Sequence, residues 1–296
     1  MPPFPKAMIN IKENPVMDIR ATLDQLNKLL QQGDFESLLQ RCSDLLENPA
    51  LEENHRVLLL DQKVKALTGL NRLEEATEAT LEELPLLEKI LGSEHMHIAN
   101  LLHNLNMFLG ASDKHAEAIP YSERELAIVR KLAPGTSREA DALVSMAEHY
   151  YEQSLFADAG KLLFEALALY EKNDGRRSLG VSTCLNNLGR SSENQNDMEK
   201  GAVYLEEAAS IREELLGVHP DSAFTLLNYG TCLAALGQYL KAAQTLAHCA
   251  AVYEALDMSD SPFAAAARKN LELCSSALEP KEASSCLAAG GCCCRN

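Results

Sequence analysis

The chain contains no tryptophan, and only 5% of its 296 residues are aromatic. Positive charge is also scarce, because 27 lysines and arginines stand against 43 aspartates and glutamates, for a formal net charge of −16. Such an acidic surface repels phosphate backbones and anionic lipid, so we expect no nucleic acid partner and no simple adsorption to a membrane. No apolar run reaches the roughly 18 residues of a spanning helix, and no secretory leader is recognisable, so a cytoplasmic protein is expected.

The nine cysteines are not arranged as a disulfide framework. Five occur singly within apolar helical patterns, where we expect them to be small buried side chains. These are Cys42, Cys184, Cys232, Cys249 and Cys274. Three others, Cys292, Cys293 and Cys294, are adjacent in an Ala/Gly/Ser-rich tail, residues 278–296, that we expect to be disordered. Reversible palmitoylation, metal or redox chemistry, and no function remain as alternatives for these three residues.

Alanine, leucine and glutamate are abundant and favour helix, and a repeat is visible in the positions of turn-forming residues. Six such residues recur at spacings of 38, 42, 41, 42 and 41: Gly33, Asn71, Asp113, Ser154, Asn196 and Gly237. A large residue follows each of them by two positions, and a small residue follows five of them by five positions. Tyr239 is expected to wedge between the two helices of its pair, and Gly201 to mark a close helix approach.

These columns predict an all-α solenoid of about six helix pairs within residues 16–277, preceded by an extension, residues 1–15. The first helices of the pairs are expected at residues 16–32, 51–69, 96–110, 137–152, 178–194 and 221–235. The second helices are expected at residues 35–47, 72–90, 114–131, 156–172, 198–215 and 239–256. A thirteenth helix, residues 262–277, is capped by Ser261 and closes the open end of the solenoid.

A second motif opens some of the pairs. It reads LGVHPDSA at residues 216–223 and LGSEHMHIA at residues 91–99, and the helix motif LLNYG at residues 226–230 recurs as LNNLG at residues 185–189. Together with the turn columns, these motifs resemble the tetratricopeptide repeat, and the period of 41 to 42 residues resembles its kinesin-light-chain variety. The resemblance implies a right-handed superhelix whose first helices line a concave groove.

The resemblance also implies which residues face that groove. One polar column on the first helices, the polar ladder, comprises Asn104, Ser145, Asn187, Asn228 and Asn270. An amide there can pair with the backbone of an extended peptide, with selectivity supplied by neighbouring side chains. Those neighbours are His103, Asn186, Arg190 and Lys269. The alternative is that the ladder bonds to the adjacent helix and orders the stacking.

No nucleophile–base arrangement, phosphate-binding loop or pair of acids in a pocket is recognisable, so neither an enzyme nor a cofactor is expected. His95, His97 and His103 lie close in sequence, but His95 matches the loop residue His219 of another repeat, and no metal site is expected. The sequence therefore predicts a scaffold or adaptor that binds peptide segments of other proteins, in an oligomeric state left open. The alternatives are a membrane-recruited adaptor acylated on its tail, and a regulatory or cochaperone-like subunit.

Overall fold

The structure, a computed structural model, describes residues 18–278, and the regular secondary structure within that range is all α-helix. The helices are α1 (Ile19–Gln32), α2 (Phe35–Leu46), α3 (Glu53–Gly69), α4 (Leu73–Leu91), α5 (Met96–Ala111), α6 (His115–Leu132), α7 (Ser137–Glu152), α8 (Phe156–Asp174), α9 (Leu179–Asn194), α10 (Met198–Leu216), α11 (Pro220–Ala235), α12 (Tyr239–Ala255) and α13 (Pro262–Leu278). Odd-numbered helices from α1 to α11 are the first helices of pairs, and even-numbered helices are the second helices. The predicted all-α class, the six pairs and the last helix are confirmed, and every boundary agrees within three residues.

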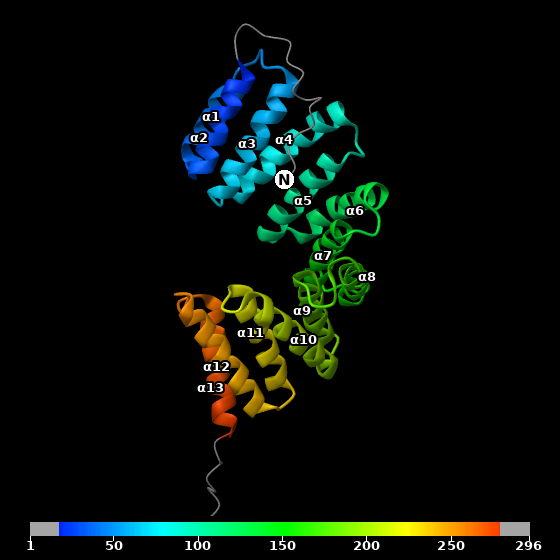
Figure 1. Ribbon diagram of the computed structural model, residues 1–296, viewed down its shortest axis with the longest axis vertical. Coiled ribbons are helices and arrows are strands. Elements are labelled where there is room, and N and C mark those ends of the chain that lie inside the picture. Colours follow the sequence, from blue (N-terminus) through cyan, green and yellow to red (C-terminus); the bar gives the residue numbers. More distant parts are fainter. Residues whose placement is uncertain (1–17, 279–296) are drawn as a thin grey trace, which may run out of the picture. The chain divides into compact units, whose positions relative to one another are not determined.

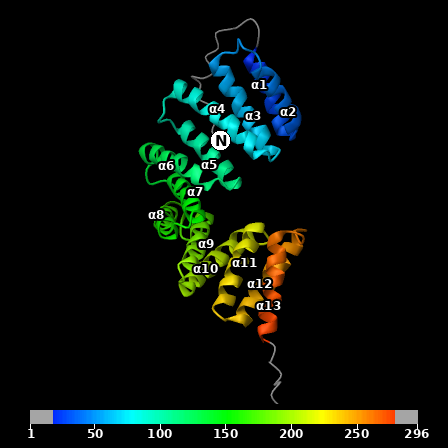
Figure 2. The same cartoon turned by 180° about the vertical axis from the view of Figure 1, so that it is seen from behind.

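The chain divides into two compact units, residues 1–176 (unit 1) and residues 177–296 (unit 2). Unit 1 holds four helix pairs, α1 to α8, in which each helix packs against the next along the chain. Unit 2 holds two pairs and α13, which packs on α12 and touches α11. Figure 1 and the reverse view in Figure 2 show these helices lying side by side in chain order within each unit.

The turns inside the six pairs share one backbone conformation. All six predicted turn residues have positive φ, from 56° to 72°, in the left-handed region. At the last turn, the Gly237 N–H donates to the Ala234 carbonyl (3.0 Å) and the Gln238 N–H donates to the Leu233 carbonyl (2.9 Å). This pair of bonds satisfies carbonyls left open at the helix end. A seventh turn of the same form, with Asp257 at φ 56°, ends α12 and was not anticipated from the sequence.

The small residues of the repeat lie where the two helices of a pair come closest. A Cβ atom on Gly201 would lie 3.1 Å from the Gly189 carbonyl oxygen, and one on Gly230 would lie 2.6 Å from Cγ of Leu246. The predicted close approach at Gly201 is therefore confirmed. The predicted wedge at Tyr239 is wrong: its side chain is 39% exposed, because as the first residue of α12 it lies at the outer end of the pair.

Side chains cap several helices at their N-termini. The Nδ1 atoms of His95 and His219 accept hydrogen bonds from the backbone N–H groups of His97 (3.2 Å) and Asp221 (3.1 Å). The Ser261 hydroxyl accepts from the Ala264 N–H (3.1 Å), which confirms the predicted cap of α13. Each cap satisfies an N–H group that the first helical turn leaves unpaired.

The five cysteines predicted to be buried are all buried free thiols. Burial raises the pKa of Cys42, Cys232 and Cys249 to about 12, so these side chains stay protonated at neutral pH. Because the thiolate is the reactive form, they act as packing residues of the helical core.

Candidate functional site

The polar ladder lies on the first helices, and its five side chains are all half-buried. Asn104 and Ser145 belong to unit 1, on α5 and α7, and the other three residues belong to unit 2. The structure therefore places one part of the ladder within each unit. Each part combines packing against neighbouring helices with an accessible edge.

In unit 2 the ladder amides bond across helices. The Asn228 side-chain Nδ2 donates to Oδ1 of Asn186 (3.0 Å), and Asn186 Nδ2 donates to Oδ1 of Asn187 (3.1 Å). The first bond links α11 to α9, and the second, within α9, extends it into a short chain of amides. On α13, Asn270 Nδ2 donates to the Thr231 hydroxyl of α11 (3.1 Å). Ladder amides in this unit therefore take part in helix stacking.

In unit 1 the ladder side chains use none of their hydrogen-bonding groups within the described part of the chain. Neither Asn104 nor Ser145 has a side-chain hydrogen bond to any residue between 18 and 278. A half-buried amide that leaves a donor and an acceptor open can bind both groups of a peptide backbone. Unit 1 is thus where the ladder is most available to a ligand.

Next to Asn104, a fully buried carboxylate anchors three side chains. Oε1 of Glu125, on α6, lies 3.1 Å from Nδ1 of His103 and 2.8 Å from Nη2 of Arg138, and its Oε2 accepts from Nδ2 of Asn106 (2.9 Å). Glu125 is 0% exposed, whereas His103 and Arg138 are each about one-quarter exposed. The buried carboxylate therefore fixes two nitrogen-bearing groups whose outer parts remain accessible.

A second buried glutamate lies one repeat earlier, since 125 − 83 = 42. Glu83, on α4, is 1% exposed, and its Oε2 has no hydrogen-bond partner among the described residues. Burial, and then the negative charge of Asp61 on α3, raise the pKa of Glu83 well above its ordinary value. Burial also raises the pKa of Asp61, although Asp61 is paired with the half-buried Lys65. Lys65 thus adds another anchored, partly exposed nitrogen-bearing group to unit 1.

Sequence reasoning selected His103 but missed Arg138, Lys65 and the two glutamates. A signal for the glutamates exists in the repeat register, because the equivalent positions in later repeats hold Ala166, Ala208 and Cys249. A glutamate in a column of small residues marks a buried site that needs polar partners. The two selected basic residues with long side chains lie in unit 2: Arg190 of α9 is half-buried and Lys269 of α13 is exposed.

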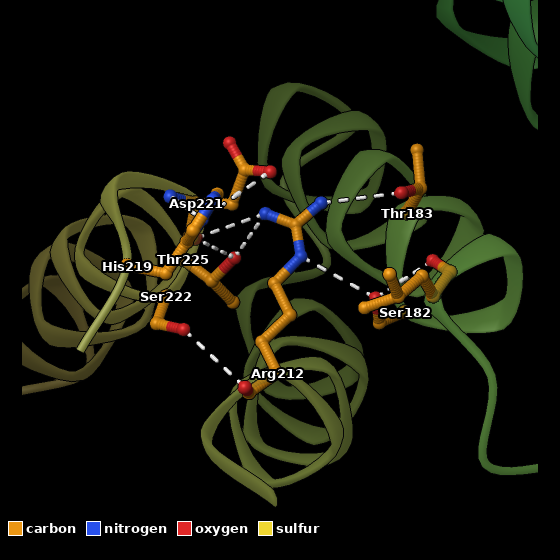
Figure 3. A network of polar contacts seen from close by, with 8 residues as sticks. Ser182, Thr183, Arg212, His219, Asp221, Ser222 and Thr225 are labelled. Atoms are coloured by element: carbon orange, nitrogen blue, oxygen red, sulfur yellow. Dashed lines mark hydrogen bonds and ion pairs between the residues drawn. The ribbon is translucent and has the colours of Figure 1, made fainter. Parts of the chain in front are cut away.

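A further polar network, also missed from the sequence, joins α9, α10 and α11 (Figure 3). Arg212 of α10 is 8% exposed, and its guanidinium donates to the Ser182, Thr183 and Thr225 hydroxyls (3.3, 3.2 and 2.7 Å) and to the Asp221 backbone carbonyl (3.0 Å). Burial lowers its pKa, and the charge of Asp221 opposes this shift. Because its donors are directed at protein atoms, Arg212 stabilises helix packing.

Two classes of site find no support in the described part of the chain. No three His, Cys, Asp or Glu side chains between residues 18 and 278 are grouped as a metal ion would require. None of the helices in that range is long and apolar enough to cross a bilayer. Cys292, Cys293 and Cys294 lie outside the described residues, so their acylation stays a prediction.

Residues 181–222, which span α9, α10 and the start of α11, match the family model of the tetratricopeptide repeat. Residues 181–222 form a repeat of the tetratricopeptide type. No curated protein matches the chain by sequence comparison. The family match thus covers one of the six helix pairs and the entry into the next, and solved structures extend the likeness.

Three similar structures illustrate the shared fold. A putative kinesin light chain repeat protein from Podosopora anserina is 19% identical, with a TM-score of 0.58, and the match covers 70% of this chain and 99% of that one. The quorum sensor NprR from B. thuringiensis is 14% identical, with a TM-score of 0.71, covering 90% and 73%. A Rap protein complexed with competence and sporulation factor is 16% identical, with a TM-score of 0.54, covering 88% and 86%. The resemblance to tetratricopeptide repeats, and to those of kinesin light chain among them, is confirmed.

Proposed function

We propose that this protein is a cytoplasmic, non-catalytic scaffold or adaptor whose first helices bind an extended peptide segment of a partner protein. The observation that carries the proposal is the repeat-periodic polar ladder, in which Asn104 and Ser145 of unit 1 make no side-chain hydrogen bond among residues 18–278. An extended peptide presents backbone donors and acceptors at regular intervals, which half-buried amides and hydroxyls can satisfy. The fold of the Rap protein, whose structure contains a bound factor, is consistent with this use of the repeats.

Neighbouring side chains of unit 1 supply selectivity in this proposal. Lys65 and Arg138 are held by buried carboxylates, so their side chains lose little further conformational freedom when a ligand binds. His103 can serve as a donor or acceptor beside them. A peptide carrying acidic or amide side chains beside its paired backbone suits this face best. In unit 2, Arg190 and Lys269 play the corresponding role.

Selection from a displayed random-peptide library, followed by affinity measurement on the purified full chain, tests the proposal. We expect Asn104→Ala to weaken binding of the selected peptides without changing the melting temperature, because that amide makes no hydrogen bond to the other described residues. The double variant Asn187→Ala/Asn228→Ala is expected to weaken binding about five- to a hundredfold, since each hydrogen bond contributes roughly 0.5–1.5 kcal/mol net. Gln244→Ala, which removes an exposed amide from second helix α12, is the matched control.

The competing role of the ladder gives a different result. If the double variant loses thermal stability while affinity per folded molecule is preserved, the unit 2 amides only order the stacking. If Asn104→Ala also leaves affinity unchanged, the first-helix face is not the peptide site and the proposal fails.

A further inference from the structure

A pocket of about 610 Å³ lies in unit 1, between α4, the end of α5 and α6. It is formed mostly by second helices, and no ladder residue contributes to it. Its lining comprises Glu74, Thr77, Glu78, Leu81, Leu109, Lys114, Glu117, Pro120 and Tyr121. We call it the outer pocket. Its volume falls in the range of pockets that accept one or more side chains of a ligand.

The floor of the outer pocket is apolar. Leu109 is buried and Tyr121 is half-buried, while Leu81 at the edge is 41% exposed. The Thr77 hydroxyl already donates to the Leu73 carbonyl (2.9 Å), so it adds little polarity. An apolar ligand side chain placed here would remove the exposed part of Leu81 from water, which is favourable.

The rim of the outer pocket is negative. Glu74, Glu78 and Glu117 are exposed, and none forms an ion pair with a cation among residues 18–278. Two nearby carboxylates differ, because Glu75 is paired with Arg72 and Glu82 is paired with Arg56. Lys114 is the one cationic residue of the lining. Three unpaired carboxylates around an apolar floor repel one another and favour a cationic ligand.

We propose that the outer pocket is a second docking surface, for a partner segment in which an apolar side chain is flanked by lysine or arginine. Charge complementarity selects this occupant: the apolar side chain packs on Leu81 and Tyr121, and the flanking cations pair with the rim. This site is separate from the ladder, whose proposed ligand is an extended backbone with acidic or amide side chains. The two sites would let one chain bring two segments together.

A synthetic peptide array tests the proposal on the full chain. The array carries Leu, Ile, Phe or Tyr flanked by lysine or arginine at varied spacing, and a matched array replaces each cation by glutamate. We expect the basic array to bind and the acidic array not to bind. The triple variant Glu74→Gln/Glu78→Gln/Glu117→Gln should lower affinity about tenfold, because it removes three exposed ion pairs that are each weak. Leu81→Ser should also weaken binding.

Two controls separate this site from general attraction to an acidic protein and from the ladder. Glu199→Gln/Glu254→Gln/Glu272→Gln makes the same charge change at exposed positions of unit 2 and should leave affinity unchanged. Asn187→Ala/Asn228→Ala should also leave it unchanged, so failure here and failure of the proposed function are distinguishable. Equal weakening by both glutamate triples, or no binding by any basic peptide, overturns the proposal.

Other occupants give their own results, and each overturns the partner segment. If Lys6→Glu/Lys12→Glu/Lys281→Glu in the full chain strengthens peptide binding, a segment of the chain itself fills the pocket. If sedimentation shows a dimer that Leu81→Ser abolishes, the occupant is a second copy of the chain.

Discussion

In unit 1, the second helices α4 and α6 bury Glu83 and Glu125, whereas the equivalent position in unit 2 holds Ala208 on α10 and Cys249 on α12. The helix pairs keep the same turn geometry in both units. Glu125 is accommodated because the flanking first helices supply His103, Asn106 and Arg138 as partners. Glu83, whose Oε2 has no partner among the described residues, is accommodated differently, because burial raises its pKa and favours the neutral acid. In unit 2, small side chains and close helix contact replace these partners.

The largest effect is expected when the buried carboxylate of Glu125 is removed from unit 1. We expect Glu125→Ala to destabilise unit 1 by about 2–4 kcal/mol, because it leaves Arg138 and Asn106 without their acceptor and creates a cavity. Hydrogen exchange with mass spectrometry should show faster exchange in α5, α6 and α7. Glu123→Ala, an exposed change on the same helix, is the control. Equal exchange in the two variants would show that Glu125 stabilises nothing.

In unit 2, the corresponding test changes Gly201, where the two helices of a pair come closest. Gly201→Leu is expected to cost about 1–3 kcal/mol through overpacking against the Gly189 carbonyl. Thermal unfolding followed by circular dichroism measures it. Gly160→Ala in unit 1 is expected to have the opposite effect. The added Cβ atom would have no neighbouring atom within 4 Å, so alanine should stabilise the helix by roughly 0.5–1 kcal/mol. A loss of stability in Gly160→Ala would contradict the assigned register.

The buried Glu83 of unit 1 makes the stability of the protein depend on pH. Its pKa is raised in the folded state, so above about pH 4.5 the unfolded chain releases a proton that the folded chain retains. Stability from this group therefore falls as pH rises towards the folded pKa. The amide introduced by Glu83→Gln cannot ionise, so the stability of this variant relative to the parent should increase as pH rises above about 4.5, with a slope of at most about 1.4 kcal/mol per pH unit.

Glu206 in unit 2 is the matched control for this pH effect. A hydrogen bond from Lys241 lowers the pKa of Glu206, so its carboxylate is favoured in the folded state. Stability from Glu206 is present above its unfolded pKa and is lost as pH falls through the lower folded value. Glu206→Gln should therefore show no growing gain over the same range. Urea unfolding at each pH measures both, and parallel curves for the two variants would refute the distinction.

The smallest expected difference concerns the ladder. Asn228→Ala removes the bond to Asn186 and should cost about 0.5–1.5 kcal/mol of stability. Asn104→Ala should cost little, because Asn104 has no side-chain partner between residues 18 and 278. Equilibrium unfolding in urea compares them. Equal costs would mean that the two parts of the ladder have the same structural role.

Most of the fold was predictable because one backbone constraint recurs. Asn71, Asp113, Ser154 and Asn196 occupy the left-handed region, which few residue types tolerate, so residue type alone marked the turns and set the helix boundaries. The buried cluster around Glu125 was not predicted, because a glutamate in a helix is usually solvent-exposed. Its burial depends on Arg138 and His103 from neighbouring helices, which only tertiary packing brings together. Tyr239 was wrongly placed because size alone does not say which way a side chain at a helix start points.

Because one turn recurs, the connections inside the helix pairs have equivalent geometry and can replace one another. Asn196 and Gly237 share the same backbone conformation and the same pair of hydrogen bonds, and each is followed two residues later by the first residue of a second helix. A polypeptide joined directly from residue 196 to residue 238 would meet an unchanged geometry at the junction. The length of such a molecule can therefore change by whole repeats. A repeat can be removed or duplicated at a turn, and the turn at the junction keeps its backbone conformation.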